Sequence, residues 1–565
     1  MKQNFKLIII AIVIACTGCS DYLDTLPGDK YDDASVWGNA VYAEQFVFNI
    51  YLGIPYPYQW YMSGALVDEQ VPNQVDGIVT RVTESNLTPD DLGAFADNWG
   101  ACMQGWWWND AYTNIRACNK FFEKVDQVPF PNQEKKEQLT AEVHFLRAYF
   151  YYVLMAQYGG VILLDKPVEM GDNYTIPRSS FEETINFIVD DLDAAINSEV
   201  LATQQDKTRA TVGAALALKS RVLLYAASDM HHDLSWAGSY DHLDLIGYPN
   251  STTALRRSLY EGAKRAAELC MDQGYSLYNV NADKAKNFSD LFLQMSSAEQ
   301  IFITKYDKLN WSYWATDWPA WITGPPSYGG YALNTVTANL ANVFENIDGT
   351  PFDWEAQRWD PYSGRDPRFE ASILHNYSHW YAWGYDNWID IASPWGVDYV
   401  TLEKQGTGYF MKKFISPLEN NWYYGTPQPQ PYIQIRYAEV LLNYAEACLA
   451  LEEEAAARSK MNDIRERAGM PEIPALENGA ALLKRYRNER RVELAFEGHR
   501  FFDVRRWLIA PEAYVPAKGV NFDYSEYKEI VVDPNRKWNN SHYLIPIQRT
   551  EINKNTALIQ NPHYK

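Results

Sequence analysis

Apolar residues recur at helical spacing through long stretches of this chain, and this periodicity restricts the fold more than any other feature. Within 138–158 and again within 209–230, apolar side chains return every three or four residues, which places them on one face of a helix. Gly159 and Gly160 directly follow the first stretch and predict its end. The sequence therefore predicts a mainly α-helical protein.

Similar patterns predict additional helices along the chain. Ser180, followed by Glu182 and Glu183, is typical of a helix start with acidic residues in its first turn. Helices are expected at 40–52, 107–125, 180–196, 254–273, 435–451, 454–468 and 480–496. Helix pairs with short joints favour a tetratricopeptide-like scaffold, an α-α superhelix, although no single repeat consensus fits all of them.

The segment from about 300 to 425 lacks this helical period. It is rich in Trp, Tyr, Gly, Pro and Asn, and ten of the twenty tryptophans fall between Trp311 and Trp395. We interpret it as a large insertion of loops and short strands that packs on the helical scaffold. Ligand-contacting residues concentrate in long irregular segments of this kind.

The N-terminus has the features of a secretory signal. Lys2 and Lys6 precede an apolar run at 7–15, which is far shorter than the ~20 residues that a membrane-spanning helix needs. The pair Thr17-Gly18 before Cys19 resembles a bacterial lipobox, which implies cleavage after residue 18 and acylation of Cys19. Residues 19–35 are then a lipidated tether. The alternative is an ordinary secretory signal in which Cys19 is incidental.

The rest of the chain is predicted to form an N-terminal helical region at 36–230 and a C-terminal region at 231–565 that contains the insertion. A net charge of -22 repels phosphate backbones, so no nucleic-acid partner is expected, and sulfated polyanions are disfavoured more weakly. A local basic groove is the alternative. Four cysteines remain after residue 19, too few for a disulfide scaffold. Buried free thiols are expected, with a Cys102–Cys118 bridge as the alternative.

Possible catalytic groups have plainer structural explanations. Glu489, Glu493 and Glu497 share one helical face, but arginines crowd the same segment, which favours ion pairs that orient a helix junction. His375 and His379 have the spacing of two metal ligands but lack the Glu that the zinc-protease motif requires. His231-His232-Asp233 is expected to be a polar loop. No nucleophile elbow, phosphate-binding glycine loop, cofactor motif or metal motif is present in the sequence.

Aromatic residues at irregular intervals suit sugar recognition better. Pyranose faces stack on aromatic rings, while sugar hydroxyls require directed hydrogen bonds. The candidate glycan-binding residues are Trp60, Tyr61, Asp68 and Trp99 upstream, and Trp311, Tyr313, Trp314, Trp318 and Trp321 in the insertion. Glu69, Asn98 and Asp317 are additional polar candidates. The alternative is that most of these rings fill the core or a protein interface.

Several segments, in order along the chain, resemble signature blocks of the SusD family. They are AEVHFLRA at 141–148 with YGG at 158–160, YAEVLLNYAEA at 437–447 with RERAG at 465–469, RRVELAFEGHRFFD at 490–503, and YLIPI at 543–547 with QNP at 560–562. The resemblance covers nearly the whole mature chain.

This resemblance implies a tetratricopeptide-like scaffold, display on the outer-membrane surface, and partnership with a SusC-like TonB-dependent transporter. It also implies capture of oligosaccharides, or of peptides in some relatives, without catalysis and without a cofactor. Ligand-binding aromatics of the family lie in variable loops, so no binding residue is carried over. The leading hypothesis is a glycan-binding uptake subunit. The alternatives are a peptide-binding subunit and a surface glycoside hydrolase.

Overall fold

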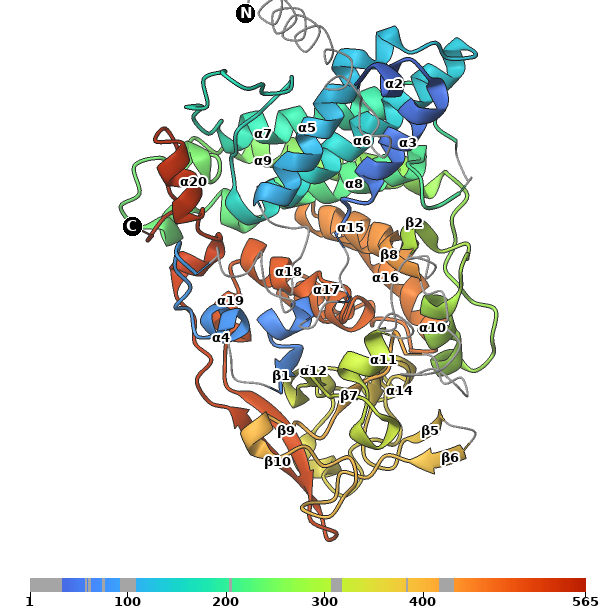
Figure 1. Cartoon of the computed structure of the whole chain (residues 1–565). Coiled ribbons are helices and arrows are strands. Elements are labelled where there is room, and N and C mark those ends of the chain that lie inside the picture. The colour runs from blue at the N-terminus through green and yellow to red at the C-terminus, as the bar shows by residue number, and fades with distance from the viewer. Residues whose placement is uncertain are drawn as a thin grey trace, which may run out of the picture.

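The computed structural model describes residues 33–55, 58, 62–73, 77–91, 108–202, 206–305, 318–382, 385–415 and 431–564. Within these residues the protein is mainly helical, as the periodicity predicts. The long helices gather in the upper part of Figure 1, and short helices with small sheets form the lower part.

The upper part is an array of antiparallel helix neighbours. Its first members are α3 (Ala40–Tyr51), α5 (Trp108–Lys124), α6 (Gln133–Tyr158), α7 (Phe181–Ile196), α8 (Val212–Ala226) and α9 (Thr253–Met271). From α5 onward, each of these helices packs against the next one along the chain. The array continues with α15 (Tyr437–Ala450), α16 (Glu454–Ala468) and α17 (Ala480–Glu493), and α15 packs directly against α9.

This last contact shows that the chain leaves the array after α9 and returns to it at α15. The intervening segment is therefore an insertion between two neighbouring helices, and the predicted superhelix with a large irregular insertion is confirmed. The inserted helices are short: α10 (Lys284–Leu293), α11 (Trp318–Thr323), α12 (Ala338–Ala341), α13 (Trp354–Gln357) and α14 (Pro367–Ser372).

Five two-stranded antiparallel sheets occur among the described residues. They pair β1 (Gln70–Pro72) with β3 (Asn334–Val336), β2 (Gln300–Lys305) with β8 (Pro431–Arg436), β4 (Ile373–Leu374) with β7 (Phe410–Met411), β5 (His379–Ala382) with β6 (Tyr385–Trp388), and β9 (Ala517–Phe522) with β10 (Tyr527–Asp533). The β2–β8 sheet joins the two parts, because Phe302 packs edge-to-face on Phe145 of α6 with ring centroids 5.1 Å apart.

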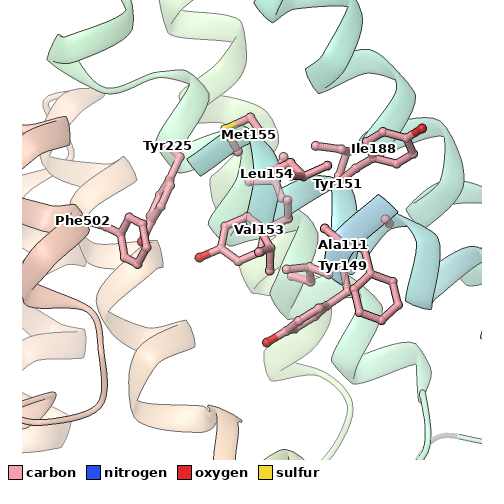
Figure 2. Close-up of a cluster of buried hydrophobic side chains, with 14 of the residues drawn as sticks. Ala111, Tyr149, Tyr151, Val153, Leu154, Met155, Ile188, Tyr225 and Phe502 are labelled. Atoms are coloured by element: carbon pink, nitrogen blue, oxygen red, sulfur yellow. The ribbon is translucent and has the colours of Figure 1, made fainter. Parts of the chain in front are cut away.

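The core of the array is centred on α6, whose side chains are buried on nearly every face. Figure 2 shows Val153, Leu154 and Met155 among neighbours from other helices, including Ile188 of α7 and Tyr225 of α8. A helix that is apolar on all faces must lie inside a layer of other helices. The position of α6 between α5, α7 and α8 satisfies that requirement.

Helix boundaries differ from the expectations by a few residues, at starts and at ends. The helix expected at 138–158 begins five residues earlier, at Gln133, because the Asn132 side chain caps it by accepting a hydrogen bond from Lys135 N at 2.8 Å. Its end is as predicted, and Gly159 adopts a φ of 79° there. The helix expected at 209–230 is shorter, since Thr211 caps its start and it ends at Ala226.

The remaining helices are α2 (Asp33–Trp37), α4 (Gly77–Thr83), α18 (Arg500–Arg506), α19 (Ala510–Ala513) and α20 (Arg549–Lys554). None of the described helices is long and apolar enough to cross a membrane. Cys118, Cys270 and Cys448 are buried free thiols, as predicted, whereas Cys102 lies outside the described residues.

Candidate ligand-binding site

The described ends of several chain segments meet at one place below the helical array. Lys305, at the end of β2, pairs with Pro431, at the start of β8. Tyr58 packs edge-to-face on both Phe414 and Tyr432, with ring centroids 5.3 Å apart in each pair. Tyr58 and Lys305, the described residues that precede the two predicted aromatic groups, therefore both lie at this junction.

The helix α11 carries two of the predicted ligand residues, Trp318 and Trp321, and packs against β3. Its residue Ile322 is fully buried, and the Ile322 carbonyl accepts a hydrogen bond from Leu333 N at 2.7 Å. The Leu333 carbonyl in turn accepts from Asn73 N at 2.9 Å. These bonds join α11 to the segment that follows β1. The backbone that carries Trp318 and Trp321 is therefore held in place by hydrogen bonds.

Six predicted ligand residues, Trp60, Tyr61, Trp99, Trp311, Tyr313 and Trp314, lie outside the described residues, as does Cys19. For Trp318 and Trp321 the structure gives the backbone position only. The aromatic set thus stays a prediction, and the structure adds the convergence of the segments that flank it.

Asp68 is the predicted polar ligand residue that the structure describes fully, and it is buried. Its two carboxylate oxygens accept hydrogen bonds from Arg500 at 3.0 Å and 2.9 Å, and Arg491 donates to the same carboxylate at 2.8 Å. Burial raises its pKa, but the charges of Arg491 and Arg500 outweigh this effect and lower the pKa of Asp68 to about 2. The structure places this carboxylate in the ion-paired interior.

The neighbouring carboxylate of Glu69 is in the opposite situation. Glu69 is 1 % exposed and accepts one hydrogen bond from the Phe496 backbone N–H at 3.3 Å. Burial, followed by the negative charge of Asp68, raises the pKa of Glu69 to about 7. One member of this acidic pair is thus held charged while the other is held close to neutral.

A larger group of buried ion pairs lies next to the junction, and we call it the inner charge cluster. The two are joined because the Tyr432 hydroxyl donates a hydrogen bond to the Glu497 carbonyl. The acidic members of the cluster are Glu299, Glu345, Asp366, Glu489, Glu493 and Glu497, and its basic members are Arg368, Lys413, Arg436, Arg465, Arg467 and Arg485. The members come from α17, from β8 and α16, and from the insertion, so the cluster joins all three regions.

Glu493 is the centre of this cluster and is fully buried. One carboxylate oxygen accepts from Arg436 at 2.6 Å and from Arg467, and the other accepts from Arg368 at 3.0 Å. Burial opposes the charge, yet the three guanidinium groups hold the pKa of Glu493 well below its usual range. The structural interpretation of Glu489, Glu493 and Glu497 is confirmed, but their partners come from distant segments and not from the arginines beside them in sequence.

The histidines considered as metal ligands also have structural roles. The His375 ring stacks on Tyr362 with centroids 4.0 Å apart, and the His231 ring stacks on Phe181 at 4.0 Å. Burial lowers the pKa of His231 to about 3, so its ring is neutral. Within the part of the chain that the structure describes, no group of His, Cys, Asp and Glu side chains could hold a metal ion.

Exposed aromatic side chains gather at a place that sequence reasoning did not single out. Tyr377, Trp388, Trp395 and Tyr524 are between 49 % and 80 % exposed and lie in or beside the β5–β6 and β9–β10 hairpins. The tryptophan excess of the insertion was visible in the sequence, but periodicity gave no means to distinguish these exposed rings from buried ones such as Trp380.

Models of two protein families match this chain. The model of the SusD family matches residues 298–564, and the model described as starch-binding associating with outer membrane matches residues 22–224. The first match contains every member of the inner charge cluster, and the second covers the first half of the helical array.

Solved structures and curated proteins agree with the family models. A SusD-like protein from Bacteroides fragilis has a TM-score of 0.78 at 30% identity and covers 94% of this chain and 99% of its own. A SusD-like carbohydrate binding protein from the same species has a TM-score of 0.70 at 22% identity, with 93% and 100% covered. A curated SusD-like protein from Bacteroides ovatus is 24% identical over 93% of this chain and 85% of its own.

Proposed function

Since this chain belongs to the SusD family, we propose that it is a non-catalytic glycan-binding protein of the cell surface. The observation that carries this proposal is the convergence of the segments flanking the aromatic residues at 60–61 and 311–321 on one junction. Two groups of rings that begin at the same place can line one binding surface, and stacking on rings is how proteins bind the apolar faces of sugars.

The described carboxylates favour binding over hydrolysis. A glycosidase needs two carboxyl groups facing each other across an open cleft, one of them free to donate a proton. Asp68, Glu489 and Glu493 are buried, and arginines occupy their oxygen atoms. Glu489 and Glu493 hold the insertion against the helical array, whereas Asp68 holds its own segment to α17 and α18. The rings supply the binding.

We further propose that Cys19 is lipidated and anchors the protein to the outer membrane, where a SusC-like TonB-dependent transporter imports the captured glycan. The first described helix, α2, starts at Asp33, fourteen residues after Cys19. A flexible tether of that length spans about 20 Å on average. Such a tether would keep the body close to the membrane and still allow it to move over a transporter.

Binding of the protein without its lipid anchor, beginning at Ser20, to a panel of neutral and sulfated polysaccharides tests the proposal. We expect neutral polysaccharides to bind and no new reducing ends to appear. Trp314→Ala and Trp318→Ala should each weaken binding about tenfold, because a lost stacking contact of about 1.4 kcal/mol corresponds to a factor of ten. Thermal stability should change little in both variants.

Trp359→Ala is the matched control, because Trp359 is 61 % exposed and lies outside the predicted set. If both ring variants bind as the wild type does while Trp60→Ala or Trp99→Ala does not, the site lies upstream of the insertion. If the wild-type protein binds peptides and no polysaccharide, the proposed function is wrong.

A further inference from the structure

Three aromatic rings form a connected surface at the tip of the β9–β10 hairpin. Phe522 ends β9, and its ring lies 5.9 Å from the ring of Tyr377 and 5.9 Å from that of Tyr524, measured between centroids. Tyr377 is 51 % and Tyr524 is 58 % exposed, while Phe522 is partly covered between them. Tyr527 stacks beneath Phe522 at 4.5 Å and is buried, so the surface rests on a packed base.

Both exposed tyrosines occupy an unfavourable backbone conformation. Tyr377 has a φ of 64° and Tyr524 a φ of 68°, in the left-handed region that favours glycine and asparagine. Strained conformations of bulky residues persist where the surrounding structure enforces them, and they cluster at functional sites. Here the strain occurs at two separate positions, and both aim a ring at the same neighbour.

Two exposed tryptophans lie on the segments next to these rings. The turn that carries Trp395, which is 80 % exposed, is fixed to the tip because Ser393 N donates a hydrogen bond to the Phe522 carbonyl at 3.1 Å. Trp388 on β6 is 49 % exposed, and its ring centroid lies 3.4 Å from that of His379 on β5. We call the rings of Tyr377, Trp388, Trp395, Phe522 and Tyr524 the tip surface.

The tip surface lies far from the tethered end of the molecule. In Figure 1 the β5–β6 and β9–β10 hairpins lie at the lower end, whereas α2, the first helix after the proposed tether, lies at the upper end. Hairpins that lie this far from the proposed anchor are poorly placed for contact with lipid. They are well placed to meet a polymer that approaches from the medium.

A short path leads from the proposed glycan site to this surface. The Tyr328 hydroxyl, seven residues after Trp321, donates a hydrogen bond to the Trp380 carbonyl on β5 at 3.1 Å. The segment that follows α11 therefore lies against the β5–β6 hairpin, where Trp388 is exposed. One extended chain could contact both places.

We propose that the tip surface is a second glycan-contact surface, which binds a neutral polysaccharide already held elsewhere along its length by the site around 60 and 311–321. This inference rests on the proposed function and adds a subsite to it. The rings of Tyr377 and Phe522 are inclined by 78° and those of Phe522 and Tyr524 by 52°, so each ring offers a separate contact and not one flat platform. Contacts of this kind are weak singly and gain strength when one polymer engages both surfaces.

The charges around the tip agree with a neutral ligand. Asp523 and Glu526, in the turn between β9 and β10, are paired with Lys528, so the turn carries excess negative charge that would repel a polyanion. Polar residues such as Asp523 and Ser525 alternate with the rings, and this mixture suits a sugar, whose apolar faces stack on rings while its hydroxyls require polar partners.

The test compares a long neutral polysaccharide with a short oligosaccharide cut from it, chosen as the ligand that the wild-type protein binds in the panel above. The variant is the double substitution Tyr377→Asn with Tyr524→Asn. Asparagine removes each ring and tolerates the left-handed backbone, so the variant should fold at least as well as the wild type. We expect its affinity for the polymer to fall about tenfold or more, because avidity is lost, while its affinity for the oligosaccharide is unchanged.

Tyr174→Ala is the control, because Tyr174 is 54 % exposed but lies in the loop between α6 and α7. If the double variant binds the polymer as tightly as the wild type does, the proposal is wrong. Equal losses for polymer and oligosaccharide would make the tip part of the first site and overturn a second surface. Loss of binding to phosphatidylglycerol vesicles with polymer affinity intact would make it a membrane contact. A wild-type protein that binds no polysaccharide refutes the proposed function itself.

Discussion

The helical array and the interior beneath it bury their side chains in opposite ways. Around α6 most buried residues are apolar, as with the fully buried Val153 and Leu154, and the buried charges there, such as Arg147, are fewer. Where the end of the array meets the insertion, charged groups such as Arg368 and Glu493 are buried to the same extent, with 1 % and 0 % exposed. The array is held mainly by the burial of apolar surface, whereas the junction that supports the proposed site is held by ring packing together with a network of complementary charges.

The difference matters because the two kinds of interior respond differently to damage. Removal of an apolar side chain leaves a cavity that its neighbours can partly fill. Removal of one charge from a buried network leaves its partners without compensation in a medium of low dielectric constant, which is costly even though the intact network contributes little net stability. The charged interior should therefore be specific in its geometry and sensitive to single changes.

The largest effect is expected for Glu493→Ala. This change leaves Arg368, Arg436 and Arg467 with one carboxylate fewer between them, and it should lower the free energy of unfolding by about 3–5 kcal/mol. Urea unfolding followed by circular dichroism would measure the loss.

Asp290→Ala is the matched control for this change, because it breaks an ion pair between Asp290 and Lys286 that lies on the surface of α10. It should cost less than about 1 kcal/mol. If Glu493→Ala cost as little as the control, the charged interior would not be what holds the insertion to the array.

Glu69→Gln should act in the opposite direction and depend on pH. The pKa of Glu69 is raised from 4.5 to about 7 by folding, so the folded protein retains a proton that the unfolded chain releases between these values. Stability from this group is therefore lost as pH rises from about 4.5 to 7. Glutamine keeps the shape and the acceptor for Phe496 N but never ionises, so the variant should be more stable than the wild type by about 3 kcal/mol at pH 8.

Unfolding at pH 4 and at pH 8 measures this effect, since the two proteins should differ little at pH 4. A difference that is equal at both pH values would show that Glu69 does not exchange a proton on folding. The result would show how much stability the protein loses by burying Glu69 without a cationic partner. Asp68, which two arginines hold charged, is the contrasting case.

The same contrast explains what could be predicted from the sequence. Helices of the array could be predicted because apolar period and caps are local, and the errors occurred where polar residues extend a helix, as at Gln133. The sequence predicted that these glutamates form ion pairs with arginines, but it could not predict which arginines. Glu493 pairs with Arg368, 125 residues away in the chain, and no local pattern contains that information.

The aromatic residues show a similar limit. Composition marked the insertion as a ligand-binding region, but the exposure of each ring depends on strand pairing. Trp380 on β5 is 5 % exposed, and Trp388 on the paired strand β6 is 49 % exposed. Trp388 pairs with His379, the neighbour of Trp380, and successive side chains of a strand point to opposite faces. Only the three-dimensional arrangement separates a ring that fills the core from one that can meet a sugar.

The smallest loss of unfolding free energy is expected in the array, because many local contacts each contribute a small part of its stability. Ser180 caps α7 by accepting a hydrogen bond from Glu183 N at 3.1 Å, while its own N–H donates to the Glu183 carboxylate at 2.8 Å. Ser180→Ala should cost about 1 kcal/mol, and Ser180→Thr, which keeps the hydroxyl, should cost much less. Thermal unfolding of both variants measures the difference. A loss from Ser180→Ala as large as that from Glu493→Ala would mean that the array depends on single contacts as strongly as the charged interior does, and the contrast between the two regions would fail.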